Sequence, residues 1–188
     1  MTIKVYAIEK VVLFGDSLMA GYGLSNEYHL SVVLKESLIA DGLSIEVING
    51  SVSGSTSSGG LNRAEWTLSE IDVDLMILGL GANDMLRGIN PKETKKNLEQ
   101  IIKIAQDKSI EVVLAGMIAP SSHGFKYKKN FDKIYPDLSK KYKLTLIPFL
   151  LEGVALKPKY NLSDGMHPNE KGTIIISNTL KKAILNKL

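Results

Sequence analysis

Short runs of apolar residues alternate with longer amphipathic stretches along this chain. Short apolar runs bounded by glycine or polar residues are typical of buried β-strands. The run at residues 75–80 is almost wholly apolar, which favours a central strand covered on both faces. The pattern predicts strands at residues 11–14, 45–48, 75–80, 112–117 and 144–147.

The amphipathic stretches between these runs predict helices. In residues 28–40 the apolar residues Leu30, Leu34 and Leu38 recur at helical spacing. Pro91 marks the start of another helix, because a proline in the first turn loses no needed N–H group. The predicted helices span residues 28–40, 61–70, 91–107, 130–142 and 169–188. Pro136 is the place where the fourth of them would be interrupted.

Apolar strands that alternate with helices indicate a parallel sheet with helices on both faces. Because such crossovers are right-handed, we expect an α/β fold, a three-layer α/β/α sandwich around a five-stranded parallel sheet. No repeat or linker divides the chain, so residues 1–188 are expected to form one domain. Ligands of these folds bind at the carboxyl ends of the strands. The segments predicted at that edge are residues 15–17, 49–54, 81–84 and 163–168.

Composition narrows the range of partners. Of the 188 residues 44% are hydrophobic, and 23 basic against 20 acidic residues give a net charge of +3. This charge is too small to indicate a nucleic-acid partner. The apolar runs are far shorter than the roughly 18 residues of a membrane span, so no integral membrane segment is expected. The absence of cysteine excludes disulfides, a thiol nucleophile and thiolate metal sites.

Three residues have the pattern of a nucleophile with its proton acceptor. Ser17 follows the first predicted strand, where a turn can expose its hydroxyl. Asp164, three residues before His167, can accept from one imidazole nitrogen and leave the other facing the serine. Taken singly, such residues are more often found in turns, on surfaces or as helix caps. Together they would supply the nucleophile and the base that ester hydrolysis needs.

Two further positions could stabilise a negatively charged oxygen. Asn83 lies just after the most apolar strand, and its amide can donate from a rigid position. Gly54 lies in a loop of small residues, where a bare backbone N–H can approach a ligand. Each position by itself signals no more than a turn. All the candidates fall on the predicted ligand edge, in the chain order Ser17, Gly54, Asn83, Asp164 and His167.

Four blocks of this sequence resemble those of the SGNH or GDSL hydrolases. The blocks are Phe14-Gly15-Asp16-Ser17-Leu18, residues 49–56, Leu80-Gly81-Ala82-Asn83-Asp84 and Asp164-Gly165-Met166-His167-Pro168. They occur in the family's order, and the resemblance covers essentially the whole chain. Within the superfamily the chain is most similar to the bacterial arylesterase and multifunctional thioesterase I/lysophospholipase L1 group, through segments such as residues 83–88 and 115–120.

The resemblance implies a flavodoxin-like fold and a serine esterase that uses no metal and no cofactor. Ser17 would be the nucleophile, His167 its base and Asp164 the residue that orients the base. The oxyanion hole would consist of the N–H groups of Ser17 and Gly54 and the side chain of Asn83. The substrates would be small esters with aryl or short-to-medium acyl groups, with thioesters and lysophospholipids as further possibilities.

Two other functions stay open at the level of sequence. Related SGNH proteins remove acetyl groups from carbohydrates, and a catalytically silent binding module could use the same fold. Retention of the serine, asparagine, aspartate and histidine together argues against a silent module. The compartment and the oligomeric state also stay open. Residues 1–10 show no signal peptide, whereas members of this group are usually exported. The protein would be periplasmic or secreted if a leader was removed, and cytoplasmic otherwise.

Overall fold

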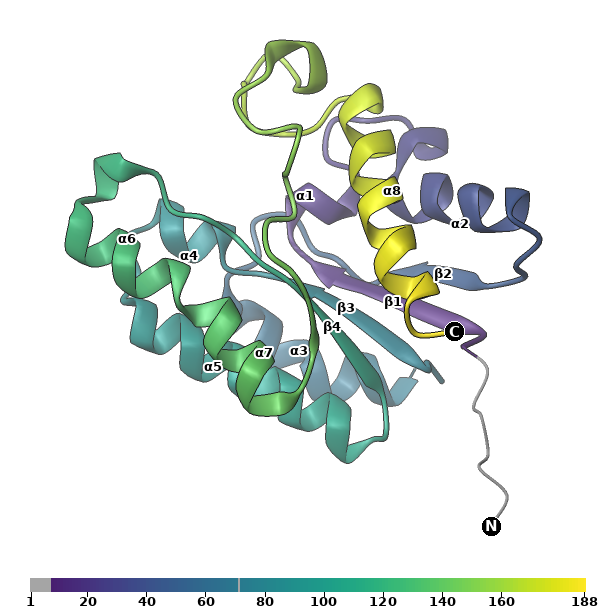
Figure 1. Cartoon of the computed structure of the whole chain (residues 1–188), viewed down its shortest axis with the longest axis horizontal. Coiled ribbons are helices and arrows are strands. Elements are labelled where there is room, and N and C mark those ends of the chain that lie inside the picture. The colour runs from purple at the N-terminus through teal and green to yellow at the C-terminus, as the bar shows by residue number, and fades with distance from the viewer. Residues whose placement is uncertain (1–7, 71) are drawn as a thin grey trace.

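The structure, a computed structural model, describes residues 8–70 and 72–188. Five parallel strands form one sheet in the order β2-β1-β3-β4-β5 (Figure 1). The strands are β1 (Lys10–Gly15), β2 (Glu46–Asn49), β3 (Leu75–Gly79), β4 (Glu111–Ala115) and β5 (Thr145–Ile147). Each lies within two residues of its predicted position. The predicted α/β fold with a five-stranded parallel sheet is confirmed.

Two layers of helices cover the sheet (Figure 1). On one face α2 (Leu30–Ala40) packs against α8 (Glu170–Leu185), and on the other α3 (Ser57–Glu70) packs against α5 (Pro91–Asp107). The helix α7 (Ile134–Tyr142) joins the second layer through its contact with α5. Right-handed crossovers account for this division between the two faces. The connection from β1 to β2 runs toward one edge of the sheet, whereas the connections to β3, β4 and β5 run toward the other edge, so their helices cover opposite faces.

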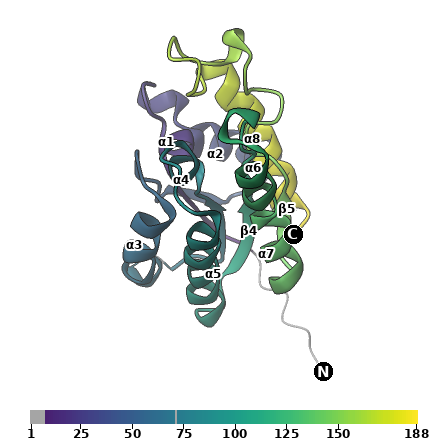
Figure 2. The same ribbon diagram turned by 90° about the vertical axis from the view of Figure 1, so that its left-hand side faces the viewer.

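The direction of the connections reverses between the neighbouring strands β1 and β3. The chain leaves β1 toward β2, then crosses back to β3 and continues outward to β4 and β5. The loops after β1 and β3 therefore diverge to opposite faces and leave a crevice at the carboxyl ends of these strands. Two short helices begin there, α1 (Ser17–Ala20) and α4 (Ala82–Leu86), and both lie toward the viewer in Figure 2. Neither was predicted from the sequence.

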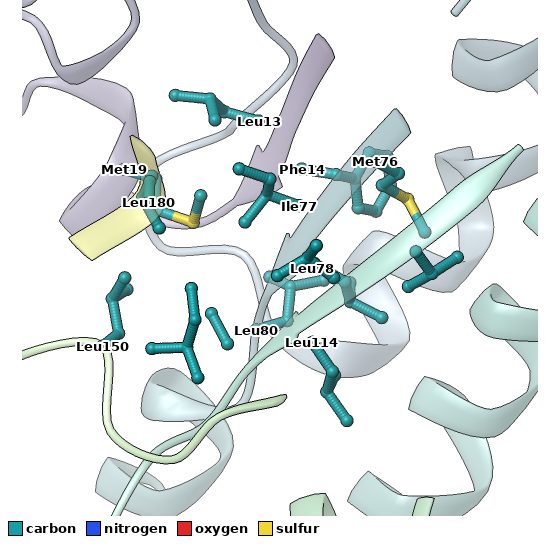
Figure 3. Close-up of a cluster of buried hydrophobic side chains, with 14 of the residues drawn as sticks. Leu13, Phe14, Met19, Met76, Ile77, Leu78, Leu80, Leu114, Leu150 and Leu180 are labelled. Atoms are coloured by element: carbon teal, nitrogen blue, oxygen red, sulfur yellow. The ribbon is translucent and has the colours of Figure 1, made fainter. Parts of the chain in front are cut away.

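The strands that end at this crevice are the most buried part of the molecule. Every residue of β3 is buried, and so are residues 11–15 of β1. Figure 3 shows their side chains packed against Met19 of α1 and Leu180 of α8. Burying each large apolar side chain contributes about 1.5–3 kcal/mol. The edge strands β2 and β5 are partly exposed. The loops of the crevice thus begin on the most rigid part of the sheet.

One predicted helix is longer than its sequence pattern suggested. The helix expected at residues 61–70 begins at Ser57, inside a stretch of serine and glycine that propensity disfavours. The N–H of Ser57 donates to the buried carboxylate of Asp84 at 2.7 Å. A helix start is stabilised by such an acceptor. Because this cap comes from a distant part of the chain, a local pattern does not reveal it.

Another prediction is corrected at residues 130–142, which do not form one helix. The chain forms α6 (Phe125–Asp132) and then α7, with the break at Lys133 instead of Pro136. Restarting at Ile134 places Pro136 in the first turn of α7, where a missing N–H group costs nothing. The helix predicted over residues 28–40 likewise begins at Leu30, so His29 precedes it. Among the described residues no helix is both long and apolar enough to span a membrane.

Candidate active site

Ser17 lies at the point where β1 turns into α1. The preceding residue, Asp16, is the N-cap of α1, and its Oδ1 accepts from the N–H of Leu18 at 3.1 Å. The backbone carbonyl of Asp16 accepts from Met19 and Ala20. Ser17 is therefore the first residue of the helix, and its half-buried side chain lines a cleft.

His167 and Asp164 share a tight turn that precedes α8. The N–H of Leu162 donates to the carbonyl of His167 at 2.8 Å, which closes the turn. Asp164 Oδ1 accepts from the backbone N–H groups of Met166 and His167 at 2.8 and 3.0 Å. Its other oxygen, Oδ2, lies 2.6 Å from His167 Nδ1. The carboxylate thus holds both the backbone and the ring of His167 in place.

The turn brings His167 to Ser17 across 150 positions of sequence, with Nε2 2.9 Å from Ser17 Oγ. Hydrogen bonds from the backbone N–H groups of His167 and Met166, followed by that from the His167 ring, lower the pKa of Asp164 to about 2. An ionised carboxylate can only accept, so the proton of the neutral ring lies on Nδ1. Nε2 is then the atom that can accept the proton of the serine hydroxyl.

Asn83 lies on the other side of the crevice, in the first turn of α4. Its N-cap, Gly81, has a φ of 117°, a backbone conformation that side-chain-bearing residues rarely adopt. Asn83 Nδ2 donates to Asp16 Oδ2 at 3.3 Å. The turn at Gly81 therefore places the amide of Asn83 next to the residue that precedes Ser17.

Gly54 approaches the same cleft from the loop after β2. Its φ of 78° again favours glycine, although a Cβ there would meet no atom within 4 Å. Its carbonyl accepts from Arg87 Nη2 at 3.1 Å. Within residues 8–70 and 72–188 the N–H of Gly54 donates to no protein group.

The cleft formed by these residues has a volume of about 270 Å³. Its rim is apolar, with Tyr22, Leu86 and Met166 between 44% and 51% exposed. The ring of Tyr22 lies 4.3 Å from that of His167, centroid to centroid. Four of the five predicted site residues line the cleft, namely Ser17, Gly54, Asn83 and His167. Asp164 lies behind His167. The sequence had not singled out the apolar rim.

Two arginines near the site were also missed by the sequence analysis. Arg63 of α3 donates to the carbonyls of Gly50 at 2.6 Å and Gly15 at 3.1 Å, so it joins the ends of β1 and β2. Its guanidinium lies 3.8 Å from the centre of the Phe14 ring, and burial lowers its pKa. Arg87 holds the loop of Gly54. Each arginine lies in or beside a helix and looks in sequence like a solvent-facing residue.

A buried carboxylate also anchors the helix that carries Asn83. Asp84 has no exposed surface and accepts from the N–H and hydroxyl of Ser57 and from Thr94 Oγ1. These bonds tie α4 to the starts of α3 and α5. The only sequence signal was the adjacency of Asp84 to Asn83. In the described part of the chain no three potential metal-ligand side chains converge.

Comparison with known proteins agrees with this architecture. The GDSL-like Lipase/Acylhydrolase family matches residues 13–173. An arylesterase from Vibrio mimicus is 36% identical over 182 residues, which are 97% of this chain and 91% of that protein. Thioesterase 1/protease 1/lysophospholipase L1 from Escherichia coli strain K12 is 33% identical over 184 residues, 98% of this chain and 87% of that protein.

A solved structure is similar over nearly the same length. It is the psychrotrophic esterase EstA from a Pseudoalteromonas species, inhibited by monoethylphosphonate, with a TM-score of 0.90 and 30% identity. The match covers 95% of this chain and 97% of that one. The family match and the two relatives each extend over most of the chain. This protein therefore belongs to the GDSL-like lipase and acylhydrolase family, the SGNH hydrolases, and is a carboxylic ester hydrolase.

Proposed function

We propose that this enzyme hydrolyses small carboxylic esters through an acyl-enzyme formed on Ser17. The observation that carries the proposal is the hydrogen-bonded series from Asp164 through His167 to Ser17, with contacts of 2.6 and 2.9 Å, at the floor of a cleft. A serine hydroxyl is a weak nucleophile unless an adjacent base removes its proton. His167 is that base, and Asp164 keeps its ring in the required tautomer.

The first chemical step forms a bond between Ser17 Oγ and the ester carbonyl carbon while the hydroxyl proton moves to His167 Nε2. The carbonyl oxygen gains negative charge, which the N–H groups of Ser17 and Gly54 and the amide of Asn83 stabilise. His167 then returns the proton to the departing alcohol. Water, activated by the same ring, releases the acid and restores Ser17.

The apolar rim favours substrates with aryl or acyl groups. Tyr22, Leu86 and Met166 offer contact surface to an acyl chain or an aromatic ring. The names of the relatives point the same way, toward aryl esters, acyl thioesters and lysophospholipids. We therefore propose aryl and short-to-medium acyl esters as substrates, with thioesters and lysophospholipids next.

A substrate panel tests this function. It combines p-nitrophenyl esters from acetate to long acyl chains with acyl-CoA, a lysophospholipid and acetylated sugars. We expect the highest kcat/KM on aryl or short-to-medium acyl esters. Turnover confined to acetylated sugars would replace the proposal with a carbohydrate deacetylase. A folded protein that turns over none of these compounds would indicate a silent module.

The pH dependence of activity should follow the general base. We expect kcat/KM to rise with pH through the range in which imidazole groups titrate, because the base His167 accepts a proton only when neutral. Asp164 adds nothing to this rise, because its pKa of about 2 keeps it ionised throughout. Initial rates on a p-nitrophenyl ester, corrected for spontaneous hydrolysis, give the profile. A profile that is flat over this range would contradict a histidine base.

Chelators should leave the activity unchanged. Both ring nitrogens of His167 are engaged, Nδ1 by Asp164 and Nε2 by Ser17, so neither is free to bind a metal ion. Assays before and after dialysis against EDTA should therefore give the same kcat. Inactivation by EDTA that added zinc reverses would overturn the mechanism.

A further inference from the structure

Asp16 is a buried carboxylate that the proposed mechanism does not use. It has no exposed surface, and burial raises its pKa to about 6 from an ordinary 3.8. At neutral pH it is still mostly ionised, and burying a charge destabilises a fold unless polar contacts compensate. Its two oxygens divide their contacts, because Oδ1 caps α1 through the N–H of Leu18 and Oδ2 faces Asn83 Nδ2.

The contact with Asn83 restricts how that side chain can lie. A carboxamide has a donating NH₂ group and an accepting oxygen, and a half-turn about its last bond exchanges them. Only the NH₂ group can face an ionised carboxylate, since the carboxamide oxygen would be repelled. When one N–H is donated to Asp16, the second N–H on the same nitrogen is left for a group in the cleft that Asn83 lines.

The sheet explains why the carboxylate stands at this position. β1 and β3 are paired in register up to Gly15 and Gly79, so the residues just beyond them emerge side by side. Asp16 is the first residue past β1, and Asn83 lies one short turn past β3. The two side chains meet across the crevice although 67 positions of sequence separate them.

We propose that Asp16 is a positioning residue, which fixes the amide of Asn83 so that its N–H, and not its oxygen, faces the substrate carbonyl. This inference rests on the proposed oxyanion role of Asn83 and names the Asp16 carboxylate as the group that orients its amide for that role. A donor that is already oriented needs no rearrangement when charge develops on the substrate. Asp16 therefore acts on kcat through Asn83 without touching the substrate.

Protonation of Asp16 should release this constraint. A neutral carboxyl can donate to the amide oxygen of Asn83, which permits the unproductive orientation. Two charged groups affect the pKa of Asp16: His167 lowers it and Asp84 raises it. Tyr135 is also close, because the charge of Asp16 raises the pKa of the Tyr135 hydroxyl. The acid side of the kcat profile should thus contain a second ionisation besides that of the base.

The substitution Asp16→Asn tests the proposal, because it keeps an oxygen for the N–H of Leu18 but presents an NH₂ group to Asn83. We expect kcat to fall by roughly tenfold or more, up to the 10²- to 10³-fold typical of losing one oxyanion donor, with KM little changed. In an Asn83→Ala background the same substitution should change kcat by no more than about twofold, which is the size of an ordinary departure from additivity, because the amide through which Asp16 acts is absent there.

These outcomes separate the inference from the function on which it rests. If Asn83→Ala lowers kcat but Asp16→Asn does not, the positioning role is wrong and the oxyanion role stands. Equal losses from Asp16→Asn in both backgrounds would likewise overturn positioning through Asn83. If Asn83→Ala itself leaves kcat unchanged, the oxyanion role fails, and the positioning role fails with it.

The thermal stability of Asp16→Asn distinguishes a positioning role from a structural one. Removing a carboxylate that stabilises the fold would lower the Tm, whereas removing a positioning carboxylate should not. The folded-state pKa of Asp16 lies above its ordinary value, so its contribution to stability falls as pH rises from about 4 to about 6. Asp16→Asn should therefore have an equal or higher Tm than the native protein at pH 7, and this advantage should vanish near pH 4. A clear loss of Tm at pH 7 would mean that Asp16 serves the fold.

A measurement without any substitution at Asp16 completes the test. In a His167→Ala variant, which removes the imidazole ring from the cleft, the side-chain NH₂ signals of Asn83 in ¹H–¹⁵N spectra should shift with pH as Asp16 gains its proton. Signals that stay constant across this transition would overturn the inference.

Discussion

Ser17→Ala should lower kcat by about 10⁶-fold while the protein stays folded. The side-chain oxygen of Ser17 makes its contact with His167 Nε2 and lies at the surface of a cleft, so its removal leaves no gap in the core. The Tm should accordingly change little. Loss of a nucleophile removes the acyl-enzyme path entirely, and only the slower attack of water in the remaining site persists. A residual activity near a tenth of the native value would rule out Ser17 as nucleophile.

Covalent labelling gives an independent test of the same residue. The similar esterase EstA was solved inhibited by monoethylphosphonate. We expect an organophosphonate to add once to the native protein, at Ser17, with complete loss of activity. Ser53 is the other serine of the cleft and serves as the matched control. Labelling at Ser17 should persist in Ser53→Ala and disappear in Ser17→Ala, and the reverse pattern would identify Ser53 as the nucleophile.

Asn83→Ala should lower kcat by about 10²- to 10³-fold, with a much smaller change in KM. Negative charge develops on the substrate oxygen only as the transition state forms, so a donor aimed at that oxygen acts mainly on kcat. The substitution also leaves the buried Asp16 without its donor from Asn83, which should destabilise the fold by about 1–3 kcal/mol. Rates should therefore be measured well below the Tm of the variant.

Asn83→Asp discriminates the oxyanion role from a role in the turn alone. Aspartate keeps the turn propensity of asparagine, so a turn residue would tolerate it. In this structure the new carboxylate would face both the developing oxyanion and the carboxylate of Asp16. Two carboxylates in contact repel, and one gains a proton at a raised pKa. We expect lower activity and a lower Tm, and near-native kcat with native Tm would mean that Asn83 is no oxyanion donor.

The elements of the sheet were readable from sequence because each depends on neighbouring residues. The apolar run at residues 75–80 indicates a buried strand by its own six residues, and Pro91 marks the start of its helix through the geometry of one ring. The fold class followed from the alternation of these elements. The candidate residues could be ranked because chain direction alone decides which loops lie at the carboxyl edge.

Only the tertiary structure decided which side chains of those loops contact one another and where the helices beside them begin. Asp84 caps the start of α3 from 27 residues away, and the break before α7 lies at Lys133 instead of Pro136. The alignment of His167 with Ser17, and the contact of Asp16 with Asn83, depend on the order and register of strands that no local pattern contains. Propensity and periodicity describe neighbours along the chain, whereas a catalytic distance is fixed by contacts between residues far apart in it.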